Sequence, residues 1–262
     1  ATRVHSNDPD RTVLPFFSDG VLHLVYSKDE PALEEFYLGT LTATLEWAEG
    51  SPTLMPWTEN IPAKSVLAIG STFYIGFWDG TVSGFNMTGT KVSGPVAVTT
   101  TMPDSEYERP YPILSLLADG NILASYDLLT DDLGYEVRTT TFSPSLAIVH
   151  QDVVLNVVTE GFQWKTRSVP LPDGGYMATW YSDNLDGNFS GVAMRRVLPY
   201  GTVVGVLEMT VPEYTSGTQG PPDVAFLAAN QTVAATWHSL AHPDGGTPYA
   251  ISARIIPLAL FQ

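Results

Sequence analysis

Apolar and polar residues alternate along this chain in short stretches that are separated by turn-forming residues. Alternation with a period of two residues predicts β-strands that bury one side and expose the other. The 22 glycines and 20 prolines are spread evenly, which leaves little room for helices. The longest stretch permissive for a helix, from Pro31 to Tyr37, is short and isolated. The pattern therefore predicts an all-β protein.

Five segments of the chain share one layout: an apolar run, a tight turn, an alternating strand and an aromatic residue that closes the strand. Successive turns are 49 to 57 residues apart, which indicates an internal repeat. Asp-Gly and Asn-x pairs suit these turns because they tolerate positive backbone dihedral angles. The turns are Asp19-Gly20, Gly70-Ser71, Asp119-Gly120, Asp173-Gly174 and Asn230-Gln231. The closing aromatics are Tyr26, Phe77, Tyr126, Trp180 and Trp237.

A repeat of about 50 residues matches one blade of four antiparallel strands, so we expect a five-bladed β-propeller that occupies residues 1–262 as a single domain. In the third unit we expect strands at Ile113–Leu117, Ile122–Tyr126, Tyr135–Phe142 and Val153–Thr159. The fifth unit lacks an outer strand, and the N-terminal strand is predicted to join that last blade and close the ring. The expected units are 11–60, 61–108, 109–164, 165–220, and 221–262 plus 1–10.

The fourth unit contains the most specific sequence motifs, which are LPDGGYMATW, then Asp186-Gly187, GVAMRRV and GTVVG. It resembles the degenerate Asp-Gly-Gly/Trp propeller-type repeats of extracellular microbial surface proteins. The second unit lacks the Asp-Gly turn and the first lacks the paired arginines. The resemblance implies a non-catalytic module for binding, adhesion or structural assembly. A lectin-like carbohydrate-binding propeller is the alternative, since five-bladed lectins share the architecture.

The chain is strongly acidic, with 28 acidic and 12 basic residues and a formal charge of −16. This balance argues against nucleic acid as a partner and favours a carbohydrate or protein surface, with self-assembly as a further option. No run of 18 apolar residues occurs, so we expect no membrane insertion. The start at Ala1 fits a trimmed leader or a fragment boundary, and we expect a secreted, extracellular protein. Glycosylation sequons stand at Asn86, Asn188 and Asn230.

Loops between second and third strands emerge on the same face as the links between blades, and such faces carry ligands. The links contain aromatic residues beside acidic ones, a combination that suits sugars or cationic groups. The bland alternative is that these rings pack the blade junctions. The candidate ligand-binding residues are Trp57, Tyr107, Trp164, Tyr214 and Arg167.

The acidic loop that contains Asp183, Asp186 and Asn188 offers oxygen donors for Ca²⁺, but it lacks the alternating donors and the distant glutamate of an EF-hand. A solvated turn is the alternative interpretation. With zero cysteines, thiolate metal sites and disulfides are excluded. Apart from Ca²⁺ we expect no cofactor.

Catalysis looks less favoured than binding. Glycoside hydrolysis requires two carboxyl groups, and none of the five predicted inner strands carries one, with Asp223 only at the mouth of the fifth. We expect the centre to be apolar or filled by Ser65, Ser115 and Ser168. No Gly-x-Ser-x-Gly motif or phosphate-binding loop occurs. A glycoside hydrolase remains open only if acids from the loops converge on the axis.

Overall fold

The structure is a computed structural model that describes residues 13–30, 33–44, 46–55, 61–103, 110–130, 134–185, 189–213, 217–240 and 249–261. Within these ranges the chain forms five antiparallel sheets, of which four have four strands and the last has three. Two short 3₁₀ helices, Ala228–Asn230 and Leu258–Leu260, are the helical elements of the described part. The all-β prediction is confirmed.

Each sheet is built from consecutive strands. The first contains β1 Val13–Ser18, β2 Val21–Glu30, β3 Leu33–Leu41 and β4 Thr53–Leu54. The second contains β5 Ala63–Ile69, β6 Thr72–Phe77, β7 Thr81–Asn86 and β8 Lys91–Ala97. The third contains β9 Ile113–Leu116, β10 Ile122–Thr130, β11 Gly134–Phe142 and β12 Ile148–Val154. The fourth contains β13 Gln163–Pro170, β14 Tyr176–Asp183, β15 Ser190–Val197 and β16 Met209–Thr210. The fifth contains β17 Asp223–Leu227, β18 Thr232–Leu240 and β19 Tyr249–Pro257.

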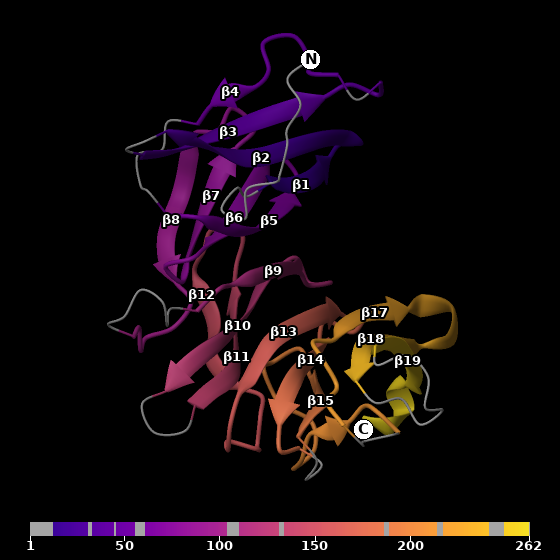
Figure 1. Cartoon of the computed structure of the whole chain (residues 1–262). Coiled ribbons are helices and arrows are strands. Elements are labelled where there is room, and N and C mark those ends of the chain that lie inside the picture. Colours follow the sequence, from indigo (N-terminus) through magenta and orange to yellow (C-terminus); the bar gives the residue numbers. More distant parts are fainter. Residues whose placement is uncertain are drawn as a thin grey trace.

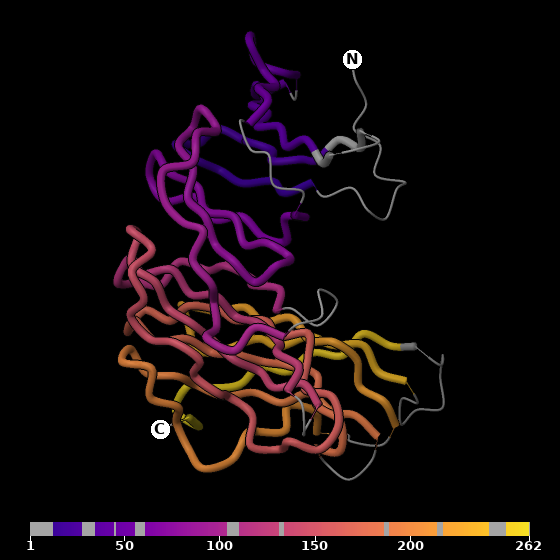
Figure 2. Tube along the Cα trace, turned by 90° about the vertical axis from the view of Figure 1, so that its left-hand side faces the viewer, coloured from indigo at the N-terminus to yellow at the C-terminus, as the bar shows by residue number. Residues whose placement is uncertain are grey.

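The five sheets follow one another along a curved row. The first strand of each sheet lies against the first strand of the next, from β1 through β5, β9 and β13 to β17. Figures 1 and 2 show the first sheet at one end of this row and the fifth sheet at the other. The N-terminal segment predicted to close the ring lies outside the described residues. Closure therefore stays a prediction, and the three strands of the fifth sheet leave β19 as its outer edge.

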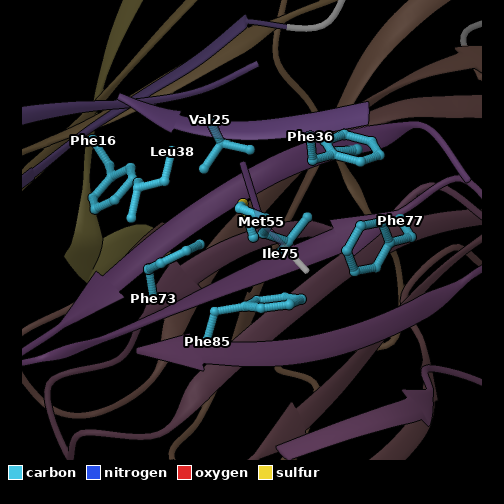
Figure 3. Close-up of a cluster of buried hydrophobic side chains, with 10 residues drawn as sticks. Phe16, Val25, Phe36, Leu38, Met55, Phe73, Ile75, Phe77 and Phe85 are labelled. Atoms are coloured by element: carbon cyan, nitrogen blue, oxygen red, sulfur yellow. The ribbon is translucent and has the colours of Figure 1, made fainter. Parts of the chain in front are cut away.

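Four of the five repeated aromatic residues are buried between neighbouring sheets. Phe77 and Trp180 are fully buried, and Tyr126 and Trp237 almost so. Phe77 shares a core with the first sheet: Figure 3 shows Phe16 and Val25 of that sheet close to the side chains of the second. Tyr126 contributes to the core between the second and third sheets, Trp180 to the next, and Trp237 to the last. The repeat spacing thus places one ring at each described sheet junction.

The inner strands and hairpins were predicted well, whereas the outer strands were not. In the third unit the outer strand is Ile148–Val154, five residues before its predicted start. In the fourth, where the sequence predicts an outer strand over 206–211, only Met209–Thr210 within it forms one. An outer strand pairs on one side only and is largely exposed, so its sequence carries a weak apolar signal. No helix in the described part of the chain is long and apolar enough to cross a membrane.

Asp152 forms a polar junction between the second and third sheets. Its Oδ2 accepts hydrogen bonds from the backbone N–H and the hydroxyl of Thr100, both at 3.1 Å. Its Oδ1 lies 2.9 Å from the Tyr126 hydroxyl and 3.3 Å from Arg138 Nη1. Burial by itself raises the pKa of Asp152, but hydrogen bonds from Thr99, Thr100 and Tyr126 outweigh it and leave the pKa below its ordinary value.

We expect Asp152→Asn to lower the free energy of unfolding at pH 7 by about 2–3 kcal/mol, because the amide turns a donor toward neighbouring donors. A depressed pKa stabilises the fold above the unfolded value, near 3.9, and this contribution is lost as the pH falls through the folded value. The difference in unfolding free energy between wild type and variant should therefore shrink below about pH 4.

Urea unfolding at several pH values measures this difference, with Asp19→Asn as the control. Asp19 is exposed and shares the positive φ of Asp152 (51° against 54°). If the difference in unfolding free energy between wild type and Asp152→Asn did not depend on pH, the lowered pKa of Asp152 would not be a source of stability.

Candidate functional site

One rim of the second, third and fourth sheets brings the start of each first strand beside the end of each second strand. This follows from the antiparallel pairing, in which Ala63 lies opposite Phe77, and Ile113 opposite Ser125. In the fourth sheet Trp164 lies opposite Tyr181. Residues that flank these strand ends are therefore neighbours in space although they are far apart in the sequence.

A cleft of about 490 Å³ opens at this rim. Five aromatic residues line it, and we call it the aromatic cleft: Trp78, Tyr111, Tyr126, Tyr135 and Trp164. The ring centroids of Trp78 and Tyr111 are 4.8 Å apart in an edge-to-face arrangement. Those of Tyr135 and Trp164 are 6.5 Å apart. The cleft thus has two aromatic pairs, one from the second and third sheets and one from the third and fourth.

Trp164 and Arg167 both line the aromatic cleft because β13 is irregular between them. In a regular strand, residues three positions apart point to opposite faces. The pairing of β13 with β14 shifts its register between these two residues, and Lys165 has a left-handed φ of 59°. Such a bulge adds one residue to the strand and changes the direction of the next side chain.

Asp127, near the end of β10, holds this bulge in place. Its Oδ2 accepts a hydrogen bond of 2.7 Å from the backbone N–H of Lys165. Its Oδ1 accepts a bond of 3.2 Å from the backbone N–H of Thr166 and a short bond from the Thr166 hydroxyl. The carboxyl group of the third sheet thereby fixes the backbone of the fourth sheet where Lys165 adopts an unfavourable conformation.

The acid–base properties of the cleft follow from its partial burial. Burial raises the pKa of Asp127, although the hydrogen bonds from Thr166 and Lys165 act in the opposite direction. Burial, followed by the charges of Tyr135 and Asp127, raises the pKa of Tyr111. The Tyr111 hydroxyl is therefore kept as a hydrogen-bond donor at neutral pH.

Two of the five predicted ligand-binding residues, Trp164 and Arg167, come together in the cleft. The other three, Trp57, Tyr107 and Tyr214, lie outside the described residues. Sequence reasoning missed other residues of the lining. The only feature of the sequence that could have identified them is their position, because each lies near the end of a strand on the same rim. The missed residues are Lys64, Trp78, Tyr111, Asp127 and Tyr135.

The structure leaves the Ca²⁺ prediction as it was. Asp183 Oδ2 accepts a hydrogen bond of 3.0 Å from the backbone N–H of Phe162, while Asp186 and Asn188 lie outside the described residues. Among the described residues, no group of three His, Cys, Asp or Glu side chains is placed to hold a metal ion. Of the sequons, Asn86 Oδ1 accepts hydrogen bonds from Thr88 within a turn, and Asn230 is exposed. Glycosylation and secretion stay predictions.

Two of the three serines expected at the centre, Ser65 and Ser168, form hydrogen bonds between neighbouring sheets. Ser65 donates a hydrogen bond of 2.6 Å to the carbonyl of Pro112 and so joins the second and third sheets. Ser168 lies 2.7 Å from Ser125 Oγ and joins the third and fourth. These hydroxyl groups link neighbouring sheets to one another.

This chain is similar to known proteins in structure but not in sequence. No protein-family model and no curated protein matches the sequence. A protein of unknown function from Dyadobacter fermentans has a TM-score of 0.56 and 13% identity, over 95% of this chain and 78% of that one. A thermostable family-43 glycoside hydrolase has a TM-score of 0.47 and 11% identity, over 93% and 87%. An α-L-arabinofuranosidase from Clostridium thermocellum has 0.44 and 11%, over 96% and 95%.

These matches correct our expectation of function. The expectation of a non-catalytic adhesion or assembly module is contradicted, because the matched structures with a named activity are glycoside hydrolases, and the lectin alternative fits these matches less well than a hydrolase. Our search for carboxyl groups was restricted to the first strands, whereas Asp127 lines the cleft from a second strand. The matches do not support the resemblance to Asp-Gly-Gly/Trp repeats. At such low identity they concern the fold alone, and the described row of antiparallel sheets that meet at their first strands is of the β-propeller type.

Proposed function

We propose that this protein is a carbohydrate-active enzyme that cleaves a glycosidic bond in the aromatic cleft. The observation that carries the proposal is Asp127, a carboxyl group with a raised pKa in a cleft lined by five aromatic rings. The volume of about 490 Å³ falls within the range of about 300–1,000 Å³ that is usual for small-molecule sites.

The aromatic residues supply the surface on which a sugar can stack. Tryptophan and tyrosine rings offer flat apolar faces, and the tyrosine hydroxyls add donors at their edges. Trp78 and Tyr111 form one wall, and Trp164 with Tyr135 forms the other. A sugar ring between them would contact apolar faces with its C–H groups and polar lining atoms with its hydroxyls.

Asp127 supplies the acid. A general acid must hold its proton at the working pH, and burial raises the pKa of this carboxyl group in the required direction. Its two oxygens already accept hydrogen bonds from Lys165 and Thr166, which fix the carboxyl plane relative to the cleft. We assign it to proton donation at the glycosidic oxygen.

Hydrolysis by a pair of carboxyl groups requires a second one. Among the described lining residues, Asp127 is the single carboxyl group. Asp131 and Asp132 follow β10 directly in the sequence and lie outside the described residues. They are the first positions at which to look for the second group by substitution.

The test is hydrolysis of a panel of neutral and acidic oligosaccharides and aryl glycosides, with release of reducing ends as the readout. We expect turnover by the wild type, a KM raised at least tenfold by Trp78→Ala, and a kcat lowered by about 10²–10⁴ by Asp127→Asn. Asp119→Asn, in an exposed turn outside the cleft, is the control. Absence of turnover of every glycoside by the wild type would contradict the proposal.

We also propose that the propeller has five blades and that its first and fifth sheets pack face to face to close the ring. In the second to fifth units the repeated aromatic is buried against the preceding sheet, whereas Tyr26 of the first unit is only half-buried. The same face carries Phe17, which is 69% exposed, because Phe17 pairs with Leu22 and Val13 with Tyr26.

The free face of the fifth sheet has the matching character. Ile251 and Ile255 are 82% and 63% exposed, and the strand pairing places both on the side opposite Trp237. Contact between the two apolar faces would cover them in the same way that every other junction is covered. The N-terminal segment would then add its strand to the free edge of β19.

A further inference from the structure

An inverted burial pattern marks the start of β13. Gln163 is fully buried, whereas its two neighbours in the sequence, Phe162 and Trp164, are 50% and 37% exposed. Successive residues of a strand point to opposite faces, so these two rings lie on the same outward face. Gln163 Oε1 has no hydrogen-bond partner within the described part of the chain. The fold thus buries a polar side chain and leaves two aromatic rings in solvent, which is typical of a binding surface.

The ring of Tyr135, in β11, completes a partly exposed group that we call the aromatic platform: Tyr135, Phe162 and Trp164. The ring centroid of Phe162 lies 5.7 Å from that of Tyr135 and 5.9 Å from that of Trp164. The centroids of Tyr135 and Trp164 are 6.5 Å apart, as described above. The three rings are therefore in mutual contact and form one continuous apolar surface across the junction of the third and fourth sheets.

Backbone contacts hold the platform in place. The N–H of Phe162 donates a hydrogen bond of 3.0 Å to Asp183 Oδ2, and the carbonyl of Phe162 accepts one of 3.0 Å from the N–H of Asp183. On the third sheet, a Cβ atom at Gly134 would lie 2.5 Å from the Gly161 carbonyl oxygen. This close approach of the two backbones brings Tyr135 and Phe162 together. Because the backbone that carries the rings is already fixed, little ordering is needed when a ligand binds.

The platform continues the aromatic cleft outward. Tyr135 and Trp164 line the cleft, whereas Phe162 lies beyond its lining. A ligand that stacks between the cleft walls can therefore extend over Phe162 without leaving the aromatic surface. The spacing of the rings, 5.7 to 6.5 Å, is comparable with the length of one sugar unit, so successive units of a saccharide chain would meet successive rings.

We propose that the aromatic platform is a second binding site, at which Phe162 stacks on one unit of an oligosaccharide while another unit of the same chain occupies the aromatic cleft. This inference rests on the proposed carbohydrate activity and names its substrate class: oligosaccharide chains rather than single sugars. An aromatic ring contacts the C–H groups of a sugar through its apolar face and needs neither a charge nor a metal ion. The occupant is a saccharide chain because the platform shares two of its three rings with the cleft.

The test measures affinity against chain length. Calorimetry gives the Kd of cello-, xylo- and arabino-oligosaccharides of one to six units for the wild type and for Phe162→Ala. In the series that binds, we expect the wild-type Kd to fall at least tenfold from the shortest to the longest saccharide, and Phe162→Ala to remove most of this gain. The Kd of the shortest saccharide that binds should stay unchanged, because the cleft alone holds it. Phe162→Trp, which keeps a flat ring, should retain the gain, whereas Phe162→Leu should not.

Tyr200→Ala is the matched control, since Tyr200 is 84% exposed in a turn outside the cleft and the platform. This variant should keep the wild-type Kd at every chain length. A gain with length that survives Phe162→Ala, or a wild-type Kd that does not depend on length, would overturn the platform and leave the proposed activity standing. An equal loss of affinity for short and long saccharides would make Phe162 a part of the cleft and would also overturn the platform.

Two further outcomes separate the platform from the proposed function. Binding that strengthens with chain length and is lost in Phe162→Ala, without turnover of any glycoside, would support the platform and overturn the proposed function. Self-association of the wild type that Phe162→Ala abolishes, measured by sedimentation velocity, would mean that a second copy of the chain covers the rings. That result would overturn the platform as a saccharide site.

Discussion

Trp180→Ala is expected to lower the free energy of unfolding by about 3–5 kcal/mol, the largest effect of any single change considered for this protein. Trp180 is fully buried between the third and fourth sheets, in a cluster with Leu123, Val137 and Leu155. Alanine would leave a cavity that the rigid strands on both sides cannot fill. For a domain of this size, such a loss corresponds to a fall in Tm of about 10 °C.

Trp180→Phe provides the matched comparison. The indole Nε1 is buried without a hydrogen-bond partner, so phenylalanine removes an unsatisfied donor while it keeps most of the ring. We expect a loss of about 1 kcal/mol for this variant. Chemical denaturation monitored by far-UV circular dichroism measures both. Similar losses for alanine and phenylalanine would mean that the N–H group, rather than the packed volume, determines stability at this junction.

The second large effect tests ring closure. In the open arrangement of Figure 1, Ile255 is 63% exposed, and Ile255→Lys would change the free energy of unfolding by no more than about 0.5 kcal/mol. If the fifth sheet packs on the first, the same change leaves an unpaired ammonium group in an apolar contact. We then expect a loss of about 3 kcal/mol. Val206→Lys, at a position that is 86% exposed, is the control.

A compensating charge sharpens this experiment. Phe17→Glu alone should destabilise the closed ring, and combining it with Ile255→Lys should recover part of the loss, because the two charges would then lie across one contact. If the losses of unfolding free energy from the two single changes simply add in the double variant, residues 17 and 255 are not in contact. Small-angle scattering gives an independent measure, since a compact chain of 262 residues has a radius of gyration of about 18 Å.

Much of the fold could be predicted because its signals are local. A turn such as Asp19-Gly20 takes positive φ at both residues, and the spacing from turn to aromatic fixes which side of the strand is buried. The outer strands were misplaced since their exposed, one-sided pairing imposes little on the sequence. The outer strand of the third unit is the clearest case, since it lies at Ile148–Val154 instead of the predicted Val153–Thr159.

The site was only partly predictable because it depends on contacts between sheets. Trp164 and Arg167 were found from their aromatic and basic character, but nothing local shows that a bulge at Lys165 brings them to one side. Asp127 resembles any other acid at a strand end until its partners on the next sheet are known. A search restricted to inner strands therefore missed the carboxyl group on which the proposed chemistry depends.

The described lining of the cleft comes entirely from the second, third and fourth sheets. The first and fifth sheets therefore contribute no described side chain to the lining of the cleft. We therefore expect substitutions on the first and fifth sheets to change the stability of the fold while they leave ligand binding in the cleft unchanged.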